Sequence, residues 1–117
     1  MRQRQDLTEG LHVIRSAAEW DEHWAGPSAD RPAVDWQTEM CVVFALGTRS
    51  SGGFFALIHA VWVTSDRMRV LAWEIRPGNC AVTRAITHPL HAVVVPAHAG
   101  PVELSKRIAH QDCEAVR

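Results

Sequence analysis

Apolar residues occur in runs of strand length over most of the chain, and turn-forming residues separate these runs. The runs are Met40 to Leu46, Phe54 to Val63, Met68 to Ile75 and Leu90 to Val95. Met40 to Leu46 is continuously apolar and the others are mainly apolar; runs of this length, bounded by glycine, proline and short polar residues, are typical of strands with buried faces. The polar segment Thr64 to Arg67 joins the second run to the third and predicts a hairpin.

The N-terminal part of the chain predicts a short strand followed by a short helix. Residues 11–15 alternate as a strand does, and Ser16 stands three residues before Glu19, which is the spacing of a capping box. The helix is expected to run to about Trp24 and to end before Gly26-Pro27. Trp20 and Trp24 would share one face and dock the helix on a sheet.

Strict alternation along the run from Phe54 to Val63 would make both of its faces apolar. One face would carry Phe54, Ala56, Ile58, Ala60 and Trp62, and the other Phe55, Leu57, Val61 and Val63. A sheet with one wet face alternates apolar with polar residues instead. We therefore expect this sheet to be covered on both sides, by curling into a barrel, by the helix or by a partner chain.

The expected fold class is α+β: one short helix packed on a curled, mainly antiparallel sheet of about five strands, barrel-like or sandwich-like. The segment Val102 to Ile108 adds an edge strand or, as the alternative, a short helix. We treat residues 1–117 as one domain and expect residues 109–117 to form a flexible tail.

Composition and charge narrow the function classes. The 117 residues are 47% apolar and 21% charged, with 12 basic and 13 acidic side chains and a formal net charge of −1. This balance creates no positive electrostatic field that would attract nucleic acid, which proteins bind through clustered lysine and arginine. We expect no membrane span, because no apolar stretch approaches the roughly 20 residues that a spanning helix needs. The localisation stays open: cytoplasmic as the chain stands, periplasmic or at the cell surface if a leader was removed.

Reactive side chains do not assemble into a recognisable motif. A nucleophile elbow of the Gly-x-Ser-x-Gly type is missing, and His88, His91 and His98 lack the spacing of metal ligands. We therefore expect no catalytic residues, no metal site and no cofactor. Cys41 is expected to be a small buried apolar residue, and a Cys80–Cys113 bridge remains an alternative that spacing alone does not decide.

Three stretches carry a resemblance to a known family. They are Val34-Asp35-Trp36, the loop from Gly47 through Gly52-Gly53 to Phe54, and Thr87-His88-Pro89 leading into Leu90 to Val95. Together with Glu74 and Pro77-Gly78 they resemble the C-terminal domain of the PrcB family over residues 11–96. Leu90 and Trp36 depart from the pattern, which has an aromatic residue after Thr-x-Pro and a phenylalanine at the position of Trp36.

The resemblance implies a non-enzymatic accessory subunit that associates with and stabilises a protease or another envelope protein. It predicts a protein partner, with a homodimer left open. Because the matching motifs are rich in glycine and proline, they bear on the fold more than on the function.

The glycine-rich loop over residues 47–53 is one candidate contact surface. The backbone N–H groups around Arg49, Ser50 and Ser51 could bind an anion, with Arg49 holding a carboxylate. The simpler interpretation is that Gly52 and Gly53, with Gly47, only let the chain turn. A small-ligand or anion-binding module built on this loop is the alternative function.

The hairpin supplies the second candidate surface. Trp62 and Trp73 stand on its two arms and are expected to form a cross-strand aromatic pair. If the pair is exposed, it would anchor a protein partner; if it is covered, it belongs to the core.

Overall fold

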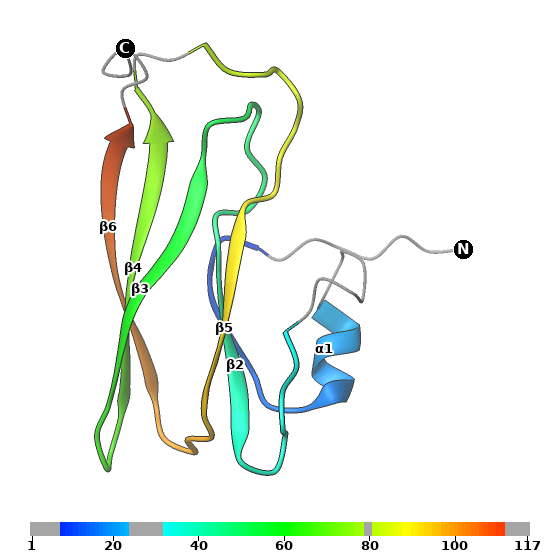
Figure 1. The fold of residues 1–117 in the computed structure, drawn as a ribbon, viewed down its shortest axis with the longest axis vertical. Helices are drawn as coiled ribbons and strands as arrows, with labels where there is room; N and C mark the ends of the chain where they lie inside the picture. The colour runs from blue at the N-terminus through cyan, green and yellow to red at the C-terminus, as the bar shows by residue number, and fades with distance from the viewer. Residues whose placement is uncertain (1–7, 24–31, 79–80, 112–117) are drawn as a thin grey trace.

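The protein is described from a computed structural model, which describes residues 8–23, 32–78 and 81–111. These residues form six strands and one helix (Figure 1). The elements in chain order are β1 (Gly10–Ile14), α1 (Ala17–His23), β2 (Glu39–Ala45), β3 (Phe55–Val63), β4 (Met68–Pro77), β5 (Leu90–Pro96) and β6 (Val102–Gln111).

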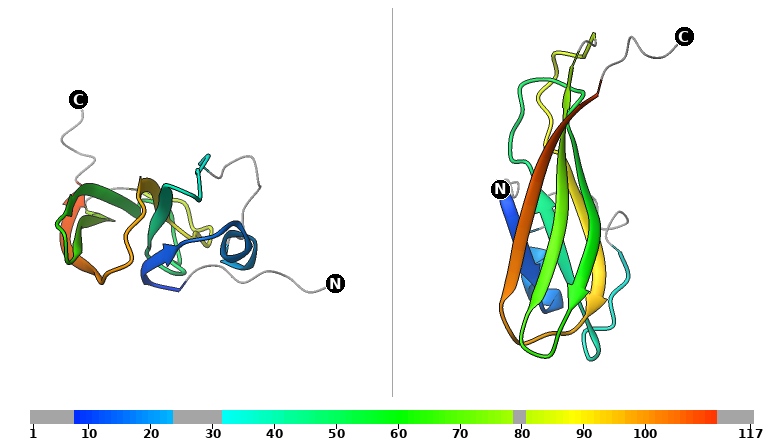
Figure 2. Two further views of the ribbon diagram at one scale, coloured as in Figure 1. Left: turned by 90° about the horizontal axis from the view of Figure 1, so that it is seen from below. Right: turned by 90° about the vertical axis from the view of Figure 1, so that its left-hand side faces the viewer.

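The strands form two sheets of three. The first sheet has the order β1-β2-β5 and is antiparallel throughout. The second sheet has the order β3-β4-β6, with β3 antiparallel and β6 parallel to β4. The chain therefore leaves the second sheet after β4, adds β5 to the first, and returns as β6. Figure 2 shows the two sheets curved around a shared interior.

Most of the core lies between the two sheets, and β2 explains its position. Alternate residues of β2 face opposite sides of the first sheet, and Met40, Val42 and Phe44 point towards the second sheet. Cys41, Val43 and Ala45 point the other way, towards α1. Both faces of β2 are buried, which is why this segment reads as a continuous apolar run.

The predicted helix is present, and its cap differs in one detail. The N–H of Glu19 donates to the Ser16 hydroxyl at 3.1 Å, as the capping box requires. The Glu19 carboxylate reaches back one residue further and accepts from the N–H of Arg15 at 2.6 Å. Trp20 is buried and meets the Trp36 ring edge-on, with centroids 6.4 Å apart. Trp24, the second residue of the expected stripe, lies outside the described residues, as does Gly26-Pro27.

The α+β class and the mainly antiparallel pairing are confirmed, but the strand number and the barrel-like closure are not. Six strands form two separate sheets in place of one curled sheet of about five. The segment beginning at Val102 is a strand, not a helix, and its ladder continues until Gln111 pairs with Pro77. The expectation of a flexible tail from residue 109 is therefore wrong for residues 109–111, because the backbone there is paired.

A bulge in β3 overturns the expected alternation of its side chains. The register against β4 shifts between Ile58 and Ala60, which leaves His59 as the extra residue. Each residue beyond the bulge faces the side opposite to that which strict alternation assigns. From the register, Ala56, Ile58, Val61 and Val63 face the core, and Phe55, Leu57, Ala60 and Trp62 face away from it.

Candidate functional site

The second sheet presents an apolar surface on the side away from the core. We call this surface the outer face. Its members, from β3 and β4, are Phe55, Leu57, Ala60, Trp62, Leu71, Trp73 and Ile75. Phe55 and Trp62 are each 53% exposed and Leu57 is 39% exposed. The right-hand view of Figure 2 looks onto this sheet, and no other described element lies in front of it. Within the described residues, neither the helix nor closure into a barrel covers this side of the sheet, so cover by a partner chain stays a prediction.

Trp62 and Trp73 share the outer face but do not form the predicted cross-strand pair. Trp62 lies opposite Arg69, whereas Trp73 lies opposite Leu57. The two indoles are thus separated along the hairpin, because the turn at Thr64 to Arg67 fixes a register in which they are not partners. Trp62 is exposed, and Trp73 is half-buried among its neighbours.

A cleft adjoins Trp62 at the turn end of the hairpin. It has a volume of about 370 Å³ and is lined by Trp62, Thr64, Arg67 and Arg69. The two guanidinium groups also reach Glu103 on β6, each at 3.5 Å. An aromatic wall beside two arginines combines two residue types that dominate binding energy at protein interfaces.

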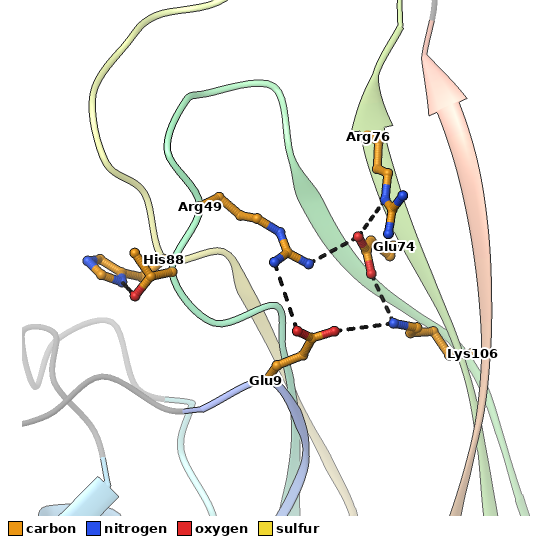
Figure 3. A network of polar contacts seen from close by, with 7 residues as sticks. Glu9, Arg49, Glu74, Arg76, His88 and Lys106 are labelled. Carbon is orange, nitrogen blue, oxygen red and sulfur yellow. Dashed lines mark hydrogen bonds and ion pairs between the residues drawn. The ribbon is translucent and has the colours of Figure 1, made fainter.

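A second cluster, of charged side chains, lies on the core side of the second sheet (Figure 3). At its centre the Glu74 carboxylate is 0% exposed. It accepts hydrogen bonds from Arg76 at 2.7 Å, Lys106 at 3.0 Å and Arg49 at 3.1 Å. Lys106 also lies 3.4 Å from Glu9, which directly precedes β1. We call these five residues the Glu74 network, and it ties the second sheet to the segments that flank β1 and β2.

The protonation states of this network follow from its contacts. Burial alone would raise the pKa of Glu74, but hydrogen bonds and charge from Arg76 and Lys106 outweigh it and hold that pKa below its ordinary value. The hydrogen bond to Glu74 raises the pKa of Lys106, against the opposing effect of burial and with further help from Glu9. Both groups are therefore ionised at neutral pH.

Arg49, the central residue of the glycine-rich loop, is engaged within the chain. Its guanidinium contacts Glu74 and lies 5.3 Å from the centre of the Phe54 ring. Its backbone N–H and carbonyl bond to Thr87, at 2.9 Å each. The Gly52 N–H donates to the Thr83 carbonyl at 3.0 Å. The loop is thus held by internal contacts, and anion binding by Arg49, Ser50, Ser51, Gly52 and Gly53 stays a prediction.

Two of the three loop glycines adopt backbone conformations that only glycine takes readily. Gly47 has φ +73° and Gly53 has φ +89°. Gly52 is needed for a steric reason, because a Cβ at this position would lie 2.6 Å from the Thr83 hydroxyl oxygen. The loop therefore needs these glycines for its path, as the simpler interpretation holds.

The three histidines considered as metal ligands, His88, His91 and His98, each contact a different part of the chain. His88 lies 3.4 Å from the Thr48 hydroxyl, and His91 accepts the Ile58 N–H of β3 at 2.8 Å. His98 accepts the Gly100 N–H at 3.1 Å. Over residues 8–23, 32–78 and 81–111, no three potential ligands gather as a metal site.

Of the cysteines, only Cys41 falls within the described residues. It is buried, and burial raises the pKa of its thiol to about 12, so it is a small core residue as predicted. Cys80 and Cys113 lie outside the described residues, and so does the alternative of a bridge between them.

Sequence reasoning found the tryptophans and Arg49 but missed Glu74 as the centre of a network. A signal was present, because Glu74 is the single carboxylate in β4 and stands within the mainly apolar stretch from Val70 to Ile75. Buried carboxylates are almost always paired with cations. The cationic partners from outside β4 are Arg49 and Lys106, which are far apart in the sequence, and only the fold brings them to Glu74.

Comparison with known proteins adds no relative: no family model, no curated protein and no solved structure matches this chain. Among the described helices, none is both long and apolar enough to span a membrane.

Proposed function

We propose that this chain is a non-enzymatic protein-binding domain that receives its partner on the outer face. The observation that supports this proposal most directly is the exposure of Phe55, Leu57 and Trp62 along one face of β3. Contiguous apolar surfaces are uncommon on monomeric proteins and typically mark interaction sites.

The composition of the outer face suits a protein partner better than a small molecule. Small-molecule sites are concave and surround most of the ligand, whereas this face is a sheet surface with one cleft at its end, beside Trp62. An open sheet surface with a tryptophan near an arginine-lined cleft matches the anchors found in protein interfaces.

The partner class is proposed from the sequence motifs. The glycine-rich loop and the Thr87-His88-Pro89 segment are the stretches that resemble the PrcB family. On that resemblance, the partner is a protease or another envelope protein, which this chain stabilises by binding.

The test is affinity capture from the native host with three versions of the tagged full chain. The versions are wild type, Leu57→Lys with Trp62→Ala on the outer face, and Ile86→Lys as the matched control. Ile86 is an apolar side chain, 66% exposed, outside the strands. We expect wild type and the Ile86 variant to retain one stoichiometric protein that the outer-face variant loses.

Circular dichroism and thermal unfolding must first show that the three versions fold alike. If the captured protein is a protease, its half-life on incubation should lengthen when this chain is added. Equal capture by folded wild type and outer-face variant would refute binding through this face. Capture of a partner from another class, lost by the outer-face variant, would support binding through the outer face and refute the proposal that the partner is a protease.

The alternative function, a ligand or anion module on the glycine-rich loop, has no comparable support. Arg49 is held by Glu74, and the N–H groups of Arg49 and Gly52 donate to backbone carbonyls. An incoming anion would have to displace a buried carboxylate from its bonds, which costs several kcal/mol. The contacts of the loop therefore favour a structural role.

A further inference from the structure

Strand β6 leaves one long edge of backbone open. It runs for ten residues, Val102–Gln111, and pairs on one side with β4. Within the described residues no strand pairs with its other side. The right-hand view of Figure 2 shows β6 as the outermost strand of the second sheet. An unpaired edge of this length is a template for another strand.

We propose that the strand that pairs with this edge is β6 of a second copy of this chain. The two strands run antiparallel, with a two-fold axis beside Ser105. Pairing in this way joins two three-stranded sheets into one continuous sheet of six strands. The proposal does not depend on the proposed function, because it uses the edge of the second sheet and not its outer face.

The charges on β6 support a second copy as the occupant. With Ser105 on the two-fold axis, Glu103 lies directly opposite Arg107 of the partner subunit, and the same pair forms again by symmetry. On the other side of the sheet, Val102 lies opposite Ile108 of the partner subunit. Opposite charges and apolar pairs at directly opposed positions stabilise antiparallel strands.

The same charges disfavour the registers centred on the two residues that follow Ser105. A two-fold axis at Lys106 would place Lys106 directly opposite Lys106 of the partner subunit. An axis at Arg107 would do the same with Arg107. Like charges in direct opposition are destabilising. Arg107 makes no ion pair with any other described residue, so it is available to the partner subunit.

Charges often protect an edge strand by pointing inward, where a second strand would bury them. Lys106 is the inward charge on β6, but Glu74 at 3.0 Å and Glu9 at 3.4 Å already neutralise it. It therefore does not block pairing. The apolar side chains of Leu104 and Ile108, which flank Lys106 on the same face, are 36% and 45% exposed and would be partly covered by the second strand.

Sedimentation equilibrium of the full chain over a wide range of concentrations tests the proposal. Wild type should reach twice the mass of one chain. Arg107→Glu and Glu103→Arg should each weaken the dimer roughly tenfold or more, because each replaces two attractive pairs with two repulsive ones. The double variant, which swaps the two charges, should dimerise again. Arg84→Glu makes the same charge change in an exposed loop and should leave the dimer unaffected.

A cross-link provides a measurement that does not depend on charge. Residues opposed across antiparallel strands have Cβ atoms about 5 Å apart, so Ser105→Cys should form an intersubunit disulfide when Cys80 and Cys113 are replaced by serine. Ser65→Cys, at the hairpin turn, should not. A wild-type chain that stays monomeric at every concentration overturns the proposal. So does a dimer that ignores all charge variants and fails to cross-link at position 105.

Discussion

At the scale of single residues, Glu74 is the most demanding feature of the molecule. A fully buried carboxylate is unfavourable unless cations and hydrogen bonds compensate it. Arg49, Arg76 and Lys106 supply three such contacts, and two of the three donors come from outside β4. The stability of the folded state therefore depends on close contact between these cations and Glu74.

We predict that Glu74→Gln lowers the free energy of unfolding by about 3 kcal/mol at pH 7, the size expected when a buried ion pair loses one member. Because the folded state lowers the pKa of Glu74, its contribution is present above the ordinary value of 4.5 and disappears as the pH falls through the folded pKa. Urea unfolding at pH 7 and pH 3 should show the difference between wild type and variant shrinking in acid. A gap that stays constant with pH would contradict this account.

The matched control is Glu103→Gln on the surface of the same sheet. Its ion pairs to Arg67 and Arg69 are both 3.5 Å long, and its side chain is 44% exposed. Exposed pairs of this kind contribute less than about 1 kcal/mol. At a protein concentration low enough to keep the chain monomeric, the same removal of charge should therefore have little effect at position 103 and a large effect at position 74.

At the scale of elements, the residue pattern predicted five of the six strands in the described residues, and gave β6 as a strand with a helix as the alternative; the strand ends differ by at most three residues. Met40 to Leu46 and Met68 to Ile75 correspond closely to β2 and β4. The bulge at His59 was not predicted from alternation. His59 is the one polar residue in the run from Phe54 to Val63, but a single polar residue in a strand does not by itself indicate an extra, unpaired position. That single residue decides on which face Trp62 lies, and hence the composition of the outer face.

Two glycines with positive φ, Gly53 before β3 and Gly10 at the start of β1, give a prediction about backbone strain. Gly53→Ala should cost about 3 kcal/mol or more, because φ is +89° and the new Cβ would lie 2.7 Å from Val82 Cγ1 and 2.9 Å from Pro77 Cβ. Gly10→Ala should cost only about 1 to 2 kcal/mol, since φ is +129° but no heavy atom lies within 4 Å. Thermal or urea unfolding of both variants checks the order, and equal losses would show that the contacts around Gly53 yield easily.

At the scale of the whole molecule, stability should be greatest in the central strand of each sheet. We predict that the amides of β2 and β4 exchange with solvent most slowly, near the rate set by global unfolding, and that β1 exchanges faster. Both central strands have neighbours on two sides, and β2 is buried from Met40 to Ala45. Hydrogen exchange measured by NMR gives the order directly. Slowest exchange in β1 would contradict this arrangement of the core.

The arrangement of the strands was beyond the reach of the sequence pattern. Alternation and turn residues predicted the β3–β4 hairpin, because its arms are adjacent in the chain. They do not reveal that β6 pairs with β4 in parallel, since that choice depends on how β5 crosses to the first sheet. The prediction of one curled sheet failed at this point. The Glu74 network was missed for the same reason, because its members meet only after the crossing.

The path of the chain between the sheets has a consequence for its synthesis. Neither sheet is continuous in sequence: the first uses strands that begin at Gly10, Glu39 and Leu90, and the second is completed by β6 at Gln111. A ribosome releases these segments in order, so the first sheet lacks β5 until Leu90–Pro96 has emerged, and the second sheet lacks β6 for longer still. In the nascent chain, β4 has β3 but not β6 as a pairing partner until Val102–Gln111 has been synthesised. Unpaired strands are exposed to misassembly during that interval, and a shortened transcript that stops before Val102 would yield an incomplete second sheet and an uncovered core.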